Sequence, residues 1–168
     1  MLFLVSATEI ISDDILSLFN FSLVIHGSDL PQGRGWSPVT WQVLEGKKEI
    51  KLSLFEAANP VDTGGIWKKI DLKVEDNALF PEIMQAITNG TLELMDFALL
   101  NLSDIRVSAQ IGQPTYYPRR ALKDSELFPE QTIGEIFNLI RICDPKRYPA
   151  FFTLKGRKFK LLIEAYED

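Results

Sequence analysis

The only histidine of the chain, His26, follows directly after Phe21–Ile25, an apolar run that predicts a buried strand. Ligands in open α/β sheets gather at the carboxyl ends of strands, so this position favours a functional role, although a lone histidine is more often structural. Asp62 stands in a second turn-rich loop, Asn59–Gly65, where Asp-Thr-Gly by itself is a common turn. A carboxylate that binds an imidazole fixes the tautomer of the ring and suits it for acid–base chemistry. The two residues are therefore candidates for one reaction centre, provided that the fold brings their loops together.

The loop after His26 has the residue types of a ligand-binding loop. It contains three glycines and two prolines up to Pro38, so its backbone can approach a ligand closely. Arg34 can pair with a phosphate or a carboxylate. Trp36 can stack on a ring, with plain packing as the alternative.

Alternating apolar runs and periodic segments predict an α/β protein, and the opening β-α-β unit predicts a mostly parallel, Rossmann-like sheet. The expected strands are Leu2–Val5, Phe21–Ile25, Glu49–Phe55 and Ile66–Val74. The expected helices are Asp13–Phe19 capped by Ser12, Pro38–Leu44 capped by Ser37, Ala78–Leu100 capped by Asp76, and Thr132–Ile142. We expect Asn89-Gly90 to break or bend the third helix and residues 104–131 to be mostly irregular. Lys155-Gly156-Arg157 predicts the turn of a C-terminal β-hairpin.

Composition indicates one soluble globular protein of 168 residues, of which 46% are apolar and 24% charged. Cys143 is the only cysteine, which excludes an internal disulfide and is typical of the reducing cytoplasm, and we expect no membrane span. Residues 1–105 contain 7 Lys/Arg against 15 Asp/Glu, a net charge of −8, whereas residues 106–168 contain 11 against 8, a net +3. A mildly basic tail can hold an anion, but it lacks the strong basic stripe that duplex nucleic acid requires.

Two motifs in this order resemble the formyltransferase-fold family, which includes methionyl-tRNA, glycinamide-ribonucleotide and sugar-nucleotide formyltransferases. The first is His26-x-Ser28-x-Leu30-Pro31-x-x-Arg34-Gly35, and the second is Val61-Asp62-Thr63-Gly64-x-Ile66. Farther along, Tyr117–Arg120 with Asp124, Asn138–Arg141 and Tyr148–Phe152 resemble the tail of bacterial sugar-type members. The resemblance covers nearly the whole chain and implies a catalytic core over residues 1–105 with a C-terminal extension over 106–168.

The resemblance implies transfer of a formyl group from N10-formyltetrahydrofolate to a primary amine, most suitably on an amino-sugar nucleotide, without a metal. His26 and Asp62 match the catalytic histidine and aspartate of the family; the histidine would stabilise the oxyanion of the tetrahedral intermediate and help to move the amine proton. Matching segments imply that folate lies near Ser6, Ala7, Thr8, Glu56, Ala57 and Val61. Candidate substrate contacts are Ser28, Arg34, Trp36, Tyr117, Arg119 and Arg120.

The sequence departs from the family pattern at two places. Val24 stands where most members have an asparagine, so either a backbone N–H or a water supplies the missing hydrogen bond to the oxyanion, or transfer is weaker. The usual opening β-α units before Leu2 are missing. We expect the exposed sheet edge to be covered by a partner or by a second copy in a homo-oligomer, or the chain to be a fragment.

Three alternatives remain open at this point. The chain can be a non-catalytic binding or assembly module descended from a formyltransferase. It can formylate methionyl-tRNA or glycinamide ribonucleotide in place of a sugar. It can also use the same His26 and Asp62 to hydrolyse formyl-folate with water as the acceptor.

Overall fold

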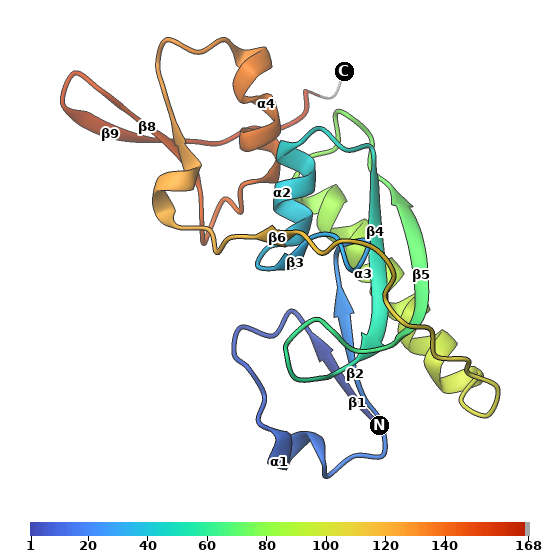
Figure 1. Cartoon of the computed structure of the whole chain (residues 1–168). Coiled ribbons are helices and arrows are strands. Elements are labelled where there is room, and N and C mark those ends of the chain that lie inside the picture. The colour runs from blue at the N-terminus through green and yellow to red at the C-terminus, as the bar shows by residue number, and fades with distance from the viewer. Residues whose placement is uncertain (167–168) are drawn as a thin grey trace.

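A four-stranded sheet with one long helix on one of its faces forms the centre of the computed structural model, which describes residues 1–166 (Figure 1). The strands β1 (Leu2–Val5), β2 (Ser22–His26), β4 (Glu49–Glu56) and β5 (Ile66–Lys73) lie in the order β1-β2-β4-β5. These bounds agree with the predicted strands to within one residue. The α/β class is confirmed.

The sheet is mixed and not mostly parallel as the sequence predicts, because only β1 and β2 run in the same direction. The chain leaves β2 at His26 and passes through the helix α2 (Pro38–Leu44), which lies beyond that end of the sheet (Figure 1). The next strand therefore starts where β2 ends and runs back beside it, pairing His26 with Ser53. A short turn then joins β4 to β5, and strands connected in this way are antiparallel.

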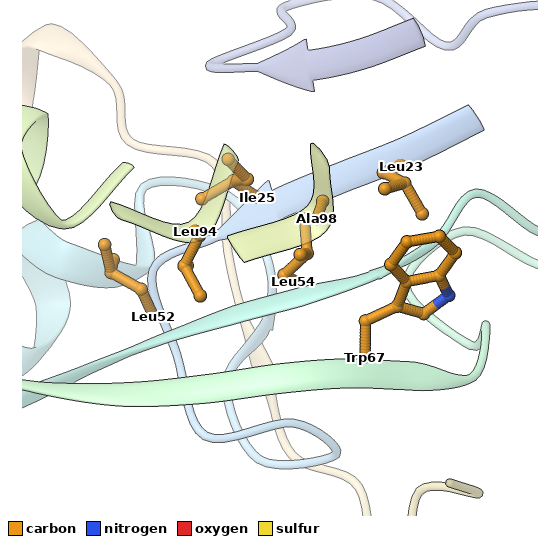
Figure 2. Packing of buried hydrophobic residues seen from close by; sticks show 7 residues of the cluster. All are labelled: Leu23, Ile25, Leu52, Leu54, Trp67, Leu94 and Ala98. Carbon is orange, nitrogen blue, oxygen red and sulfur yellow. The ribbon is translucent and has the colours of Figure 1, made fainter. Parts of the chain in front are cut away.

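The main core lies between the sheet and the helix α3 (Phe80–Leu100). Figure 2 shows its buried members, which come from β2, β4, β5 and α3: Leu23, Ile25, Leu52, Leu54, Trp67, Leu94 and Ala98. Alternate residues of a strand point to opposite faces of a sheet, so Leu23 and Ile25 face α3 while Val24 and His26 face the other way. The helix therefore leaves the face of the sheet that carries His26 free for other segments.

The helix α3 runs unbroken through Asn89-Gly90, where the sequence predicts a break or a bend. Gly90 is buried at a close approach to the sheet: an added Cβ would lie 2.8 Å from Leu72, 3.0 Å from Leu52 and 3.2 Å from Ile70. The glycine thus lets the helix axis come near the strands, and burial of the neighbouring apolar face offsets its poor helix propensity.

The smaller elements follow the predictions in most places. The helix α1 (Asp13–Leu16) is shorter than expected, α2 ends at Leu44 as expected, and α4 (Ile133–Ile142) begins with Thr132 as a true cap that accepts from Glu135 N. Residues 104–131 hold only β6 (Tyr116–Tyr117), a 3-10 turn η1 (Leu122–Ser125) and β7 (Glu126–Leu127). The hairpin of β8 (Ala150–Leu154) and β9 (Arg157–Leu161) turns at Lys155-Gly156, both at positive φ.

Three of the predicted helix caps do not form the expected hydrogen bond. Ser12 precedes α1 with an extended backbone, and Ser37 precedes α2 with a left-handed backbone (φ 49°), but neither side chain makes a capping hydrogen bond. Asp76 does not cap α3, which begins at Phe80; the Leu79 N–H instead donates to Glu82 within the first turn.

A buried arginine joins the C-terminal part to the core. Arg141 of α4 is 2% exposed, and its guanidinium donates to the carbonyls of Glu75 (3.2 Å) and Ala78 (3.1 Å) ahead of α3 and to Asn138 (2.8 Å). Burial lowers the pKa of Arg141 from its ordinary value.

The division of the chain at residue 105 stays a prediction. No helix of the described residues is long and apolar enough to cross a membrane.

Replacing Arg141 by methionine removes the hydrogen bonds of its guanidinium to Asn138 and to the carbonyls of Glu75 and Ala78, although the Glu75 carbonyl still accepts from the Ala78 N–H. We expect the free energy of unfolding to fall by about 1.5–3 kcal/mol, the range for hydrogen bonds to a charged group. Urea denaturation followed by circular dichroism measures it. Arg147→Met is the matched control, because the Arg147 side chain is 82% exposed, and its effect should stay within about 0.5 kcal/mol. Equal losses for the two variants would contradict the role of Arg141.

Candidate functional site

Three segments meet over the face of the sheet opposite α3. They are the loop 27–36 after β2, the turn 57–65 between β4 and β5, and the segment 108–118 after α3. Below them, Leu30, Phe55 and Ile66 form a small buried cluster with Val24 packed against it. Ser53 is fully buried on β4, and its hydroxyl donates to the Ser28 carbonyl at 2.6 Å, which holds the first loop to the sheet.

His26 ends β2 and reaches the loop that follows it. Its Nε2 lies 2.8 Å from the carbonyl oxygen of Gly33. A carbonyl only accepts hydrogen bonds, so Nε2 carries the proton and donates, and the neutral ring keeps the lone pair of Nδ1. The ring also stands edge-on to Phe55, with centroids 6.4 Å apart. The imidazole is thus held in one tautomer by the main chain, with Nδ1 able to accept a proton.

Asp62 is held in the turn after β4 with an uncommon backbone conformation. Its φ is 62°, in the left-handed region that few non-glycine residues adopt, and the residue is 8% exposed. Its Oδ2 accepts a hydrogen bond of 2.9 Å from the Gly35 N–H. The neighbouring Gly64 packs on the end of β4, because an added Cβ would lie 1.8 Å from the Glu56 carbonyl oxygen.

His26 and Asp62 therefore bind two consecutive peptide groups, one on each side of the Arg34 Cα. His26 contacts Gly33 O and Asp62 contacts Gly35 N. Consecutive Cα atoms lie about 3.8 Å apart, so the two side chains converge on one short stretch of the loop. The hydrogen bonds among the described residues join them through this stretch and include none directly between imidazole and carboxylate. The sequence leaves open whether the two loops meet, and it does not indicate the main chain that mediates their meeting.

The segment 108–118 holds the same loop from the other side. Gly33 N donates to Thr115 Oγ1 (2.8 Å), Arg34 N to the Thr115 carbonyl (2.9 Å) and Trp36 N to the Tyr117 carbonyl (3.1 Å). β3 (Arg34–Gly35) pairs with β6 in this way. Gly35 has φ 96°, and a Cβ there would lie 2.5 Å from the Tyr117 carbonyl oxygen, so only glycine fits this approach.

The Arg34 side chain is held by Gln110, a residue that the sequence analysis did not single out. Its Nη2 donates to Gln110 Oε1 at 2.6 Å, and the Gln110 amide donates to the carbonyls of Asp62 and Gly64, each at 2.9 Å. Nε of Arg34 is buried without a hydrogen-bond partner among the described residues. No local motif marks Gln110, because its partners are 46 to 76 positions away in the sequence.

The aromatic and basic candidates form a second group beside the loop. The Arg119 guanidinium lies over the Trp36 ring, 4.7 Å from its centroid, and Trp36 is 36% exposed. Tyr117 stacks on Trp41 and donates its hydroxyl proton to Glu45 at 2.8 Å. Burial, reinforced by the hydrogen bond to Glu45, raises the pKa of Tyr117. Of these side chains, Trp36 and Arg119 are the ones most accessible to a ligand.

Ser28 and Arg120 lie in less accessible places than the sequence implies. Ser28 is 2% exposed and its hydroxyl is buried without a partner among the described residues. Arg120 uses Nη2 to bind the Asp124 carbonyl (2.7 Å) and the Ser125 hydroxyl (3.3 Å), which fixes η1. Their proposed contact with substrate stays a prediction.

The segments expected to hold folate lie at two different ends of the sheet. Glu56 and Ala57 are beside the start of β2, whereas Ser6–Thr8 follow β1 at the end where β2 reaches Ile25 and His26. A cavity of about 350 Å³ between α1 and the end of β4 includes Glu56 and Ala57 in its wall, with Phe19, Phe21 and Ala58 nearby. Ser6, Ala7 and Thr8 are exposed after β1, and Val61 is 52% exposed on the turn; none of these four lines the cavity. Within residues 1–166, no group of three or more His, Cys, Asp or Glu side chains is placed to hold a metal ion.

The chain has clear relatives in sequence, although no protein-family model matches it. The bifunctional polymyxin resistance protein ArnA of Wigglesworthia glossinidia brevipalpis is 28% identical over 172 residues, which is 95% of this chain and 26% of ArnA. The methionyl-tRNA formyltransferase of Desulfotalea psychrophila is 32% identical over 145 residues, which is 83% of this chain and 44% of that protein. The chain thus spans less than half the length of these two relatives.

Solved structures agree with the sequence relatives. A methionyl-tRNA formyltransferase from Clostridium thermocellum superimposes with a TM-score of 0.83 at 26% identity, covering 98% of this chain and 72% of that one. HypX from Aquifex aeolicus in complex with tetrahydrofolic acid has a TM-score of 0.83 at 18% identity, over 96% of this chain and 28% of its own. A 4-N formyltransferase from Francisella tularensis has a TM-score of 0.81 at 15% identity, over 99% and 71%. The last two show the shared fold alone. In sequence and in fold, the chain is similar to the formyltransferase-fold family.

Proposed function

We propose that the chain carries the reaction centre of an N-formyltransferase that moves a formyl group from N10-formyltetrahydrofolate to a primary amine, most suitably on an amino-sugar nucleotide. The observation that carries this proposal is the attachment of His26 and Asp62 to the two peptide groups that flank Arg34. A purely structural histidine does not need a buried, strained aspartate held beside it. Formyltransferases among the relatives and folate bound to the HypX neighbour support the reaction type.

The side chains of His26 and Asp62 can each assist a different part of the formyl transfer. The amine nitrogen attacks the formyl carbon and forms a new C–N bond, which leaves a negative oxygen on a tetrahedral carbon. His26 takes the amine proton at Nδ1, because Nε2 is already committed to Gly33. The resulting imidazolium presents an N–H at Nδ1 to the oxyanion, and the buried carboxylate of Asp62 favours that positive charge. The oxyanion then re-forms the C=O bond as the C–N10 bond breaks, N10 takes the proton from His26 Nδ1, and tetrahydrofolate leaves while His26 returns to its neutral form.

The surroundings favour a small anionic amine as acceptor. Arg34 and Arg119 bring positive charge to the loop, and Trp36 beneath Arg119 offers an aromatic face. An arginine of this kind suits a phosphate, and an exposed tryptophan suits a flat base. A nucleotide-linked amino sugar has both, and a 4-N formyltransferase shares the fold. Methionyl-tRNA, the acceptor named for other relatives, is the competing substrate class.

Mass spectrometry of formyl transfer to a panel of amino-sugar nucleotides, methionyl-tRNA and glycinamide ribonucleotide tests the proposal. We expect one added formyl group on a sugar, and a drop in kcat of about 100- to 10,000-fold in His26→Ala and Asp62→Asn. Asparagine at 62 keeps an acceptor for the Gly35 N–H while it removes the charge, so the variant should fold. Exposed Asp104→Asn is the control and should keep full activity. Folate binding without any product would favour the non-catalytic module, and formate release without an amine would favour hydrolysis.

For a substitution at Val24 we predict a higher kcat, in contrast to the losses expected at His26 and Asp62. It lies two residues before His26 on the same face of β2, packed against the cluster of Leu30, Phe55 and Ile66. An asparagine there adds a donor near the reaction centre, so Val24→Asn should raise kcat, by at most about 100-fold. Burying the amide should lower the free energy of unfolding by about 1–3 kcal/mol. Val24→Thr is the control, because its shorter hydroxyl adds polarity without the reach; an equal or lower kcat in Val24→Asn would show that the oxyanion already has its donor.

We further propose that a second copy of the chain covers the outer edge of β1. This strand is wholly apolar and pairs on one side only, with β2, among the described residues. Light scattering should give twice the mass of one chain, and Leu4→Lys should shift the mass toward the monomer. Tyr166→Lys, which alters a 91% exposed residue elsewhere, should leave the mass unchanged. A stable monomer at micromolar concentration would remove this proposal and leave the reaction untouched.

A further inference from the structure

Gln110 joins Arg34 to the turn that contains Asp62 through the hydrogen bonds of its side chain. Its Nε2 donates to the carbonyls of Asp62 and Gly64, and its Oε1 accepts from Arg34 Nη2. Carbonyls only accept and a guanidinium only donates, so the amide has one orientation that satisfies all three partners. Both amide hydrogens are used, and the flipped amide would lose every contact.

The segment that carries Gln110 is itself fixed on both sides. Ser108 exchanges two backbone hydrogen bonds with Ile66 at the start of β5, at 2.8 and 2.9 Å. Farther along the segment, Thr115 binds the main chain of Gly33 and Arg34. The Gln110 side chain therefore extends from a backbone that is tied to the sheet and to the loop after β2.

The contacts of Gln110 go to the two groups that most need support. Asp62 has the left-handed backbone that non-glycine residues avoid, and the amide of Gln110 binds its carbonyl directly. Arg34 forms no ion pair with a carboxylate within residues 1–166, and its other side-chain contact is a long one of 3.4 Å to the Tyr116 hydroxyl. Its charge is thus uncompensated, and its direction depends on Gln110.

We infer that Gln110 is the positioning residue of this site: one carboxamide holds both the backbone of Asp62, from which the carboxylate projects, and the guanidinium of Arg34, and so couples the reaction centre to the anion-binding arginine. This inference rests on the proposed transfer for its kinetic consequence, but its geometric consequence is independent of it. The residue does not touch the reacting atoms; it acts through Asp62 and Arg34.

Two variants of Gln110 test its contact with Arg34 separately from its contacts with Asp62 and Gly64, and a third variant is the control. Gln110→Ala removes all three hydrogen bonds. Gln110→Glu keeps an acceptor for Arg34 but replaces the donors to Asp62 and Gly64 with a charge that also neutralises the guanidinium. Gln113→Ala makes the same change at an exposed glutamine of the same segment and is the matched control.

Steady-state kinetics with the formyl donor and a phosphate-bearing amine give the first measurement. We expect Gln110→Ala to lower kcat/KM by about 100-fold, the loss that a displacement of about 1 Å produces, while Gln113→Ala keeps the parent value. Gln110→Glu should lower kcat and also raise KM for the amine, while KM for the folate stays within about twofold of the parent value. A purely structural role predicts a lower melting temperature with unchanged kcat and KM for the folded fraction, and that result would overturn the inference.

Amide hydrogen exchange of the full chain gives a second measurement that needs no activity. The Gly35 N–H is bound by Asp62, so it reports where that carboxylate lies. Its exchange should accelerate at least about 10-fold in Gln110→Ala, while the strand amides of Leu52 and Leu54 keep the parent rate. Unchanged exchange at Gly35 would refute the positioning of Asp62. Faster exchange at Gly35 in Gln110→Ala, together with a parent protein that transfers no formyl group, would keep the positioning and discard the proposed function.

Discussion

The site depends on the main chain around Arg34 more than on any pair of side chains. The carbonyl of Gly33 and the N–H of Gly35 are a fixed acceptor and a fixed donor, and His26 and Asp62 each bind one of them. Peptide groups do not exchange the roles of donor and acceptor, so the Gly33 carbonyl fixes the proton of the neutral imidazole on Nε2 and the Gly35 N–H fixes the direction of the Asp62 carboxylate. The two positive-φ glycines are the reason that this stretch can present both groups inward.

The two faces of the sheet have different roles: one packs against α3, and the other carries His26 and the loops around it. On β2, the residues that face α3 are apolar and buried, and those on the opposite face lead to His26. The reversal at α2 brings β4 back alongside β2, so the turn with Asp62 lies after the strand that pairs with His26. A parallel neighbour would have carried this turn to a different distance from the imidazole. The antiparallel pairing places the end of β4 beside Leu23, and the turn 57–65 brings the chain back to Gly35.

Local sequence signals were sufficient for most elements, because strand alternation, the proline at the start of α2 and the apolar periodicity of α4 act over a few residues. They also give His26, Asp62 and Arg34 as candidate residues, whose types and loops suggest chemistry. Local signals could not reveal Gln110 or Arg141, because each side chain acts through hydrogen bonds to carbonyls more than 40 residues away. Strand direction was misjudged for a similar reason: apolar runs indicate burial, whereas direction depends on where the intervening helix lies. The continuous α3 shows tertiary packing overriding a local preference at Gly90.

The late position of the segment 108–118 has a consequence for synthesis on the ribosome. His26 and Asp62 emerge early, but the loop between them is closed by Gln110, Thr115 and Tyr117. A nascent chain can therefore form β2, β4 and β5 as a hairpin-like unit before its reaction centre has a defined shape. Assembly of the site therefore has to wait for residues 108–118, which follow α3 in the chain. A translational pause between α3 and β6 would leave a folded scaffold that cannot yet bind its ligands.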